Sequence, residues 1–324
     1  MKFLDNFLFK HFEPAFMVAS APYCLVFKTT NYCLDKCPHC CENSGPDQEK
    51  TYIPEDVICG YIDQALLTPH FDNNIVFTGG EIFSAYKFYD KQYVPNLLKY
   101  SLKHNIGVDI KTNAGWVGTS FGKEIFKDLK NLIIDAYAEK NERPPLQISL
   151  SIDKYHTNCL ERNLRFIKEL AGLPIEIHVS TLAHQMDTLK EFEDILFKQV
   201  KTKEAFVLVN GDNIKPLKII NNHTIYESTF GTLFKGGRAF KIPEALDVEF
   251  PQFSFCTEDL HLLFAFDNFG RVTLGENCGQ KIMTPWVDEK IQPKKLNKIH
   301  DELIDNTFKE CLYYNCYERF FRSL

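Results

Sequence analysis

The sequence predicts an α/β fold, and two observations carry that prediction. Between about residues 23 and 210, six short apolar segments alternate with longer segments whose apolar residues recur at helical spacing. Glycines and polar residues directly follow several of the apolar segments, as they do at the carboxyl ends of barrel strands. Strands separated by helices pair in parallel. We therefore expect a partial (β/α)6, TIM-like barrel, followed by a small α+β region.

Each expected element has its own local signal. The strands are short and rich in β-branched or aromatic residues, and lie at Tyr23–Lys28, Asn74–Thr78, Val108–Thr112, Gln147–Asp153, Ile175–Thr181 and Ala205–Val209. The intervening helices show apolar periodicity, and in the first of them Pro54 and acidic residues mark the start. They are expected over about 54–67, 94–104, 122–132, 160–171 and 188–200.

The pattern changes after the sixth strand, which predicts three regions. Residues 1–22 are a lead-in too short for a separate peptide-binding domain, residues 23–240 form the barrel, and residues 241–324 form the second region. In the last region, Asp267–Gly270 reads as a hairpin turn between two short strands. A final helix is expected over Leu303–Tyr314.

Composition narrows the class of partner. The chain has 324 residues, of which 44% are apolar, and a net charge of −6. The negative charge argues against a nucleic-acid partner, since such binding needs a basic surface. No apolar run approaches 18 residues, so no membrane span is expected, and the first residues lack the pattern of a signal peptide. We expect a cytoplasmic protein.

The cysteines predict a metal centre. Three of the eleven lie in Cys33-Leu-Asp-Lys-Cys37-Pro-His-Cys40, just after the first strand. Thiolates suit zinc or iron–sulfur clusters. Three of them leave one iron of a four-iron cluster without a protein ligand, whereas a zinc site would borrow His39 or Cys41 as its fourth. In a chain without an export signal, clustered cysteines indicate metal ligands rather than disulfides.

A second motif follows the second strand. Gly79 and Gly80 allow a ligand to approach the backbone, and Glu81 behind them can bind an ammonium group. Together with the C-x3-C-x2-C spacing, this Gly-Gly-Glu segment resembles the radical S-adenosylmethionine (radical SAM) superfamily. The resemblance implies a [4Fe-4S] cluster on Cys33, Cys37 and Cys40, with S-adenosylmethionine on its open iron. Reductive cleavage would release a 5′-deoxyadenosyl radical that abstracts a substrate hydrogen, the electron coming from a flavodoxin or ferredoxin.

The same resemblance assigns further cofactor-binding residues. They resemble positions that contact the adenine, ribose or methionine carboxylate, and are His39, Thr112, Asn113, Ser151, Asp153 and Arg162. Arg165 competes with Arg162 for the carboxylate, and Arg238, in a Gly-Arg-Ala segment, is expected to reach the active site. For each polar residue the alternative is an ordinary helix cap or surface contact.

Four cysteines near the C-terminus form a second group. Cys256, Cys278, Cys311 and Cys316 resemble the layout of the twitch subdomain, a shorter relative of the SPASM extension, which holds an auxiliary [4Fe-4S] cluster. Two features depart from this layout. The family commonly places a cysteine five residues after the hairpin glycine, but five residues after Gly270 this chain has Gly275. The last two cysteines, Cys311 and Cys316, are separated by four residues rather than two. Buried free thiols or a zinc site are the alternatives.

The motifs together look most like small enzymes that modify ribosomally made peptides in natural-product biosynthesis, by epimerisation or crosslinking. His156 is expected to face the substrate. Cys159 is a candidate hydrogen donor, and Cys24, Cys41 and Cys59 are others that the sequence does not separate from it. If Cys278 is not a cluster ligand, it is the better placed donor. The alternative is a radical dehydrogenase or epimerase of an aminocyclitol or sugar. A non-catalytic zinc-binding protein is a remote third possibility.

Overall fold

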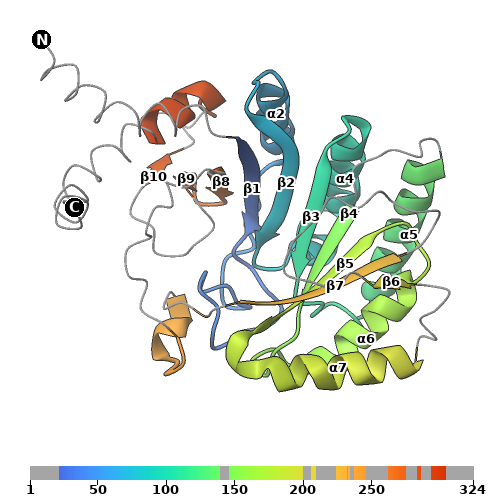
Figure 1. The fold of residues 1–324 in the computed structure, drawn as a ribbon. Coiled ribbons are helices and arrows are strands. Elements are labelled where there is room, and N and C mark those ends of the chain that lie inside the picture. The colour runs from blue at the N-terminus through green and yellow to red at the C-terminus, as the bar shows by residue number, and fades with distance from the viewer. Residues whose placement is uncertain are drawn as a thin grey trace, which may run out of the picture.

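The computed structural model describes residues 22–138, 146–199, 206–208, 224–231, 233, 237–245, 262–274, 283–285 and 293–303. Within these ranges the chain forms an α/β fold around a ten-stranded sheet with the order β10-β9-β8-β1-β2-β3-β4-β5-β7-β6 (Figure 1). Strands from β8 to β6 in this order pair in parallel, and β8–β9 and β9–β10 pair antiparallel. The predicted α/β class with a mostly parallel sheet is confirmed.

The strands are β1 (Tyr23–Thr30), β2 (Phe71–Gly79), β3 (Gly107–Thr112), β4 (Leu146–Ser151), β5 (Glu176–Leu182), β6 (Phe206–Leu208), β7 (Thr224–Gly231), β8 (Leu262–Asp267), β9 (Arg271–Leu274) and β10 (Met283–Pro285). The α-helices are α2 (Glu55–Leu66), α3 (Ala85–Phe88), α4 (Tyr93–Lys103), α5 (Gly122–Ala138), α6 (Cys159–Leu170) and α7 (Met186–Gln199). Short 3-10 turns are η1 (Ile82–Ser84), η2 (Ala183–Gln185) and η3 (Gly237–Lys241).

Burial explains why these segments form the core. All eight residues of β1 are buried, because the strand is central in the sheet and both of its faces are covered: Tyr23, Leu25 and Phe27 lie in the main core, and Cys24 and Val26 lie in a second buried cluster. Helix α6 buries Phe166, Ile167 and Leu170 at helical spacing, and Trp116 packs against Phe166 from the loop after β3. The major helices contact one another in chain order alongside the sheet (Figure 1).

Three features differ from the expected arrangement. Helix α5 continues to Ala138, six residues past its predicted end, because the apolar period persists through Ile133 and Tyr137. Strand β6 does not pair with β5, as six units in chain order would require, because β7 lies between them. Strand β8 pairs with β1, so the described part of 241–324 extends the same sheet.

The hairpin is present as predicted. Gly270 has φ +87°, and the Asp267 carboxylate accepts the N–H groups of Phe269 and Arg271. A helical stretch over 296–303 ends where the final helix was expected to begin, at Leu303, and the remainder of the expected helix, 304–314, lies outside the described residues. In the described part of the chain, we find no helix long and apolar enough to cross a membrane.

Parallel pairing determines where a site can form. The carboxyl ends of β1, β2, β3, β4 and β5 meet at one edge of the sheet, because neighbouring strands run in the same direction. The loops after β1 to β4 carry the predicted motifs, so the fold brings these motifs to a single edge.

Candidate active site

Residues 31–45, here called the cysteine loop, lead from β1 towards α2. Cys33 and Cys37 are buried, Cys40 is half-buried, and all three are free thiols. The loop folds back on itself: the N–H of Cys33 donates to the carbonyl of Gly45 at 3.2 Å, and that of Cys40 to the carbonyl of Cys37 at 3.2 Å. The three predicted ligands therefore lie in one short, internally bonded loop.

The surroundings of these thiols keep them neutral. Burial raises the pKa of Cys33 to about 12, and the negative charge of Glu81 adds to the effect. Burial likewise raises the pKa of Cys37 to about 12, with the charge of Asp35 adding to it. A bound metal reverses this balance, because it displaces the thiol proton and stabilises the thiolate. The loop is thus suited to a strongly positive centre.

The three thiols suit an iron–sulfur cluster by the chemistry of the donor set. Cysteine thiolates are the usual ligands of such clusters, and three of them leave one iron of a four-iron cluster without a protein ligand. Beside them, and among the residues that the structure describes, the side chains of His39, Asp153 and His156 place three further ligand atoms within 4.8 Å of one another.

Glu81 lies at the end of β2 and is completely buried. Its Oε1 accepts the N–H of Phe83 at 3.2 Å, and its Oε2 accepts the Thr112 hydroxyl at 2.7 Å and the N–H of Asn113 at 3.3 Å. Burial raises the pKa of Glu81 to about 7, against the opposing effect of these hydrogen bonds. An ammonium group at this position would favour the ionised form.

The structure gives the two glycines a role that the sequence did not show. The N–H of Gly80 donates to the carbonyl of Thr30 at 2.6 Å, and that of Glu81 to the carbonyl of Tyr32 at 2.9 Å. A Cβ on Gly79, where φ is +110°, would lie 2.5 Å from the Thr30 oxygen, and one on Gly80 would overlap the Tyr32 oxygen. The glycines thus let the end of β2 pack against the backbone that leads to Cys33.

Asn113 joins the two motifs. Its side-chain Nδ2 lies 3.3 Å from the sulfur of Cys33, while its main-chain N–H binds Glu81. Its Oδ1 accepts the N–H of Gly115 at 2.8 Å, which fixes the orientation of the amide. The indole of Trp116 donates to the Thr112 hydroxyl at 3.2 Å and holds that residue in place.

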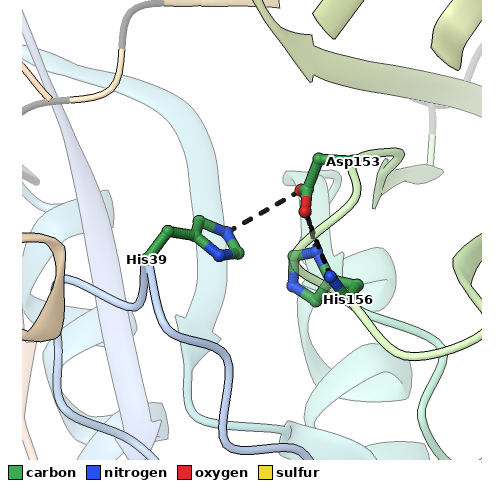
Figure 2. Close-up of side chains that lie close together, drawn as sticks. All are labelled: His39, Asp153 and His156. Carbon is green, nitrogen blue, oxygen red and sulfur yellow. Dashed lines mark hydrogen bonds and ion pairs between the residues drawn. The ribbon is translucent and has the colours of Figure 1, made fainter. Parts of the chain in front are cut away.

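The end of β4 contributes the group drawn in Figure 2. The Oδ2 of Asp153 lies 2.8 Å from Nδ1 of His156 and 3.7 Å from Nε2 of His39, which reaches across from the cysteine loop. Burial would raise the pKa of Asp153, but the hydrogen bond from His156 and the charge of that ring lower it overall. Burial lowers the pKa of His39 to about 4, so its imidazole is neutral at neutral pH. Tyr155 stacks on His39 with ring centroids 4.9 Å apart.

The other predicted residues on this side lie close by. Ser151 ends β4, and its carbonyl accepts the Asn163 amide at 2.9 Å. The buried thiol of Cys159, the first residue of α6, donates to the carbonyl of Asp153 at 3.0 Å. His156 and Cys159 both line a hollow of about 430 Å³ at the amino ends of α6 and α7. The structure therefore brings the two predicted catalytic residues to one hollow.

Arg162 takes a partner that the sequence did not indicate. Its Nη1 lies 2.6 Å from Oδ2 of Asp35, which stands between Cys33 and Cys37, and both side chains are largely buried. No short-range sequence signal marks this pair, since 127 residues separate its members. The role of Arg162 towards a carboxylate stays a prediction. Arg165 lies near Gly118, where its Nη1 would be 3.6 Å from an added Cβ.

Arg238 bonds to the cysteine loop: Nε donates to the carbonyl of Cys37 at 2.8 Å, and Nη2 to that of Ser44 at 2.6 Å.

The predicted ligands of an auxiliary cluster, Cys256, Cys278, Cys311 and Cys316, lie outside the described residues. Of the other thiols, Cys24 is buried in β1, Cys59 is half-buried in α2, and Cys41 is exposed.

No family model matches the chain. The chain is 25% identical over 211 residues to YydG of Bacillus subtilis (strain 168), whose naming as a peptide biosynthesis protein is provisional. The match covers 60% of this chain and 57% of YydG, a little over half the length of that relative.

Among solved structures, the chain is similar to Streptococcus suis SuiB bound to S-adenosylmethionine. The identity is 12% and the TM-score 0.39, over 89% of this chain and 66% of SuiB, and a similarity of this size is too weak to support an assignment. The residues carry the assignment: with Cys33, Cys37 and Cys40 after one strand and Gly79, Gly80 and Glu81 after its neighbour, the chain resembles enzymes of the radical SAM superfamily.

Proposed function

We propose that this chain is a radical SAM enzyme that removes a hydrogen atom from a ribosomally made peptide. A [4Fe-4S] cluster on Cys33, Cys37 and Cys40 would supply the electron that cleaves S-adenosylmethionine. An external flavodoxin or ferredoxin would reduce the cluster in the cytoplasm. The expected architecture for this chemistry is a partial barrel over residues 23–240 with a twitch-like subdomain over 241–324.

One observation carries the proposal. Asn113 contacts the sulfur of Cys33 with its side chain and the carboxylate of Glu81 with its main chain. A cluster ligand and a buried acid are therefore linked through a single residue at the ends of β1, β2 and β3. A ligand that binds a cluster at one end and offers an ammonium group at the other suits this arrangement, and S-adenosylmethionine has both features.

The residues of the chain have separable tasks in this proposal. Glu81 binds the ammonium group, and Thr112 and Asn113 hold the Glu81 carboxylate in position. The buried Nδ1 of His39 has no hydrogen-bond partner among the described residues, which leaves it available to the adenine or ribose of the cofactor. Asp153 and Ser151 at the end of β4 would contact the ribose and the methionine carboxylate, with Arg162 as a further partner of the carboxylate.

Two residues are proposed to act on the substrate. The Oδ2 of Asp153 holds Nδ1 of His156, which fixes the ring where it lines the hollow beside α6. Cys159 lines the same hollow, and its S–H would return a hydrogen atom to a substrate radical in an epimerisation. The thiyl radical left on Cys159 would then take up one electron, originating from the external flavodoxin or ferredoxin, and one proton to restore the thiol. The auxiliary [4Fe-4S] cluster on Cys256, Cys278, Cys311 and Cys316 completes the proposal.

The assignment of a peptide substrate rests on the resemblance of the motifs to those of small peptide-modifying enzymes, and on the provisional naming of YydG as a peptide biosynthesis protein. A short precursor-peptide gene beside this one would agree with it, and an aminocyclitol or sugar gene cluster would point to the small-molecule alternative. Turnover of the encoded peptide in deuterated water should place deuterium at one Cα if the reaction is an epimerisation. A modified peptide without deuterium would exclude epimerisation and leave crosslinking.

The metal content tests the cofactor assignment. After anaerobic reconstitution, two clusters predict about eight irons and eight sulfides per chain, and one cluster predicts about four of each. Zinc without sulfide would contradict the proposal. A Cys41→Ala variant, altered beside Cys40 but outside the triplet, is the matched control and should keep the wild-type content.

A further inference from the structure

The turn η3 lies against the cysteine loop although about 200 residues separate them in sequence (Figure 1). Three hydrogen bonds come from one residue of this turn. Arg238 donates from Nε to the carbonyl of Cys37 at 2.8 Å, from Nη2 to that of Ser44 at 2.6 Å, and from its main-chain N–H to that of Cys40 at 2.9 Å. The guanidinium fork thus spans the loop from its second cysteine to its end.

The neighbouring glycine shows that this contact is a close fit. Gly237 has φ +48°, and a Cβ on it would overlap the carbonyl oxygen of Cys41 and lie 2.7 Å from that of Cys40. The backbone of the turn therefore packs directly on the backbone of the loop. No side chain other than hydrogen could stand there without moving one of the two segments.

The far side of the turn is anchored elsewhere. Leu233, Ala239, Ile242 and Ala245 form a small buried apolar cluster, against which Tyr155 and Leu182 pack. Leu182 ends β5, and Tyr155 stacks on His39 of the cysteine loop. These contacts fix the turn to the loop after β4 and to the end of β5. The hydrogen bonds of Arg238 then hold the cysteine loop in a defined position relative to both.

We propose that Arg238 is a positioning residue that locks the cysteine loop in its ligand-binding shape and, resting on the proposed function, sets the electrostatic environment of the cluster. Its guanidinium contacts the backbone of two residues that flank the ligand Cys40. A positive charge there stabilises the reduced cluster, which carries one more negative charge.

The proposed effect of Arg238 on the shape of the cysteine loop can be tested without any cluster, on the full-length chain under reducing conditions after removal of metal. The readout is the alkylation rate of Cys37, by mass spectrometry, divided by the rate of Cys24, which is buried in β1 and reports general unfolding. The ratio should rise about tenfold in Arg238→Gln, since two charge-assisted hydrogen bonds are lost. It should stay at the wild-type value in Arg271→Gln, which removes an exposed guanidinium paired with Asp267. An unchanged ratio in Arg238→Gln overturns the proposal.

The proposed effect of Arg238 on the reduction potential of the cluster is tested on the reconstituted protein, with a third variant. Arg238→Lys keeps the charge but loses the fork, so it should raise the alkylation ratio while the reduction potential stays close to that of the wild type. Arg238→Gln should shift the potential to more negative values. Equal potentials in wild type and Arg238→Gln would overturn the electrostatic part. Failure of the wild type to form a cluster would contradict the proposed function, while the metal-free experiment would still decide whether Arg238 locks the loop.

Discussion

The side-chain amide of Asn113 lies 3.3 Å from the sulfur of Cys33, a residue 80 positions earlier in the chain. Hydrogen bonds to cluster sulfurs raise the reduction potential. Asn113→Ala should therefore make the potential more negative and lower the rate of S-adenosylmethionine cleavage about tenfold, as expected for an outer partner of a metal ligand. Redox titration followed by EPR measures the potential.

The matched control for this variant is Asn96→Ala, which removes an amide bound to Glu55 on the helical surface. It should leave both the potential and the rate unchanged. A potential that does not move in Asn113→Ala would show that the amide has no influence on the cluster.

The affinity for S-adenosylmethionine should depend on pH through Glu81. Burial raises the pKa of Glu81 to about 7, so the carboxyl is neutral below that pH and cannot pair with an ammonium group. The affinity should fall about tenfold per pH unit as the pH drops from 7 to 5.5, while the cluster stays intact. Equilibrium dialysis on the reconstituted protein measures this.

Glu81→Gln should bind weakly and without this pH dependence, because the neutral amide does not titrate. Glu169→Gln, which removes an exposed partner of Lys130, should keep the wild-type profile. A wild-type profile that is flat across this range would rule out Glu81 as the ammonium ligand.

Gly80→Ala should destabilise the protein strongly. The added Cβ would overlap the carbonyl oxygen of Tyr32, and this oxygen accepts the N–H of Glu81, so neither segment can move without losing a hydrogen bond. Overpacking against backbone costs about 3 kcal/mol. Urea unfolding measures the change in the free energy of unfolding.

Gly60→Ala provides the comparison for Gly80→Ala. Gly60 lies in the middle of α2 with no atom within 4 Å of an added Cβ, so alanine should raise the free energy of unfolding by about 0.5–1 kcal/mol. Equal effects of the two substitutions would contradict the close packing of Gly80 on Tyr32.

Glu176 should make the protein less stable as the pH rises. Burial and, next, the charge of Glu227 on β7 raise the pKa of Glu176 to about 7, above its ordinary value near 4.5. Between these two values the unfolded chain gives up the proton more readily, so the free energy of unfolding falls as the pH increases and stays low above about 7.

Glu176→Gln should remove this decrease in the free energy of unfolding with rising pH. The variant should melt at about the wild-type temperature at pH 4.5 and roughly 2–4 °C higher at pH 7.5. Glu124→Gln, at an exposed ion pair with Lys91, should follow the wild type at both values. A Glu176→Gln variant less stable than the wild type at pH 7.5 would contradict the expected direction of the effect.

The sequence was informative where the signals are local. The helical period identified α2, α4, α6 and α7, and alternation or continuous apolar character identified the strands of the parallel sheet. The cysteine and Gly-Gly-Glu motifs could be placed at strand ends because each directly follows an apolar segment. Parallel pairing then brings them to the same edge of the sheet.

What the sequence could not show depends on contacts between distant segments. The insertion of β7 between β5 and β6 is a choice of strand partner, and no local pattern encodes it. The Asp35–Arg162 pair and the bonds of Arg238 to the cysteine loop join residues far apart in the chain. The glycines were expected to make room for a ligand, and their closest neighbours are the backbone oxygens of Thr30 and Tyr32.

The measurement that tests the radical SAM assignment most directly is the formation of 5′-deoxyadenosine by the reconstituted, reduced protein supplied with S-adenosylmethionine. The wild type and Cys41→Ala should both produce it, and Cys37→Ala should produce none, because the cluster loses one of its three ligands. A Cys37→Ala variant that still forms 5′-deoxyadenosine, or a wild type with a full cluster that forms none, would contradict the assignment.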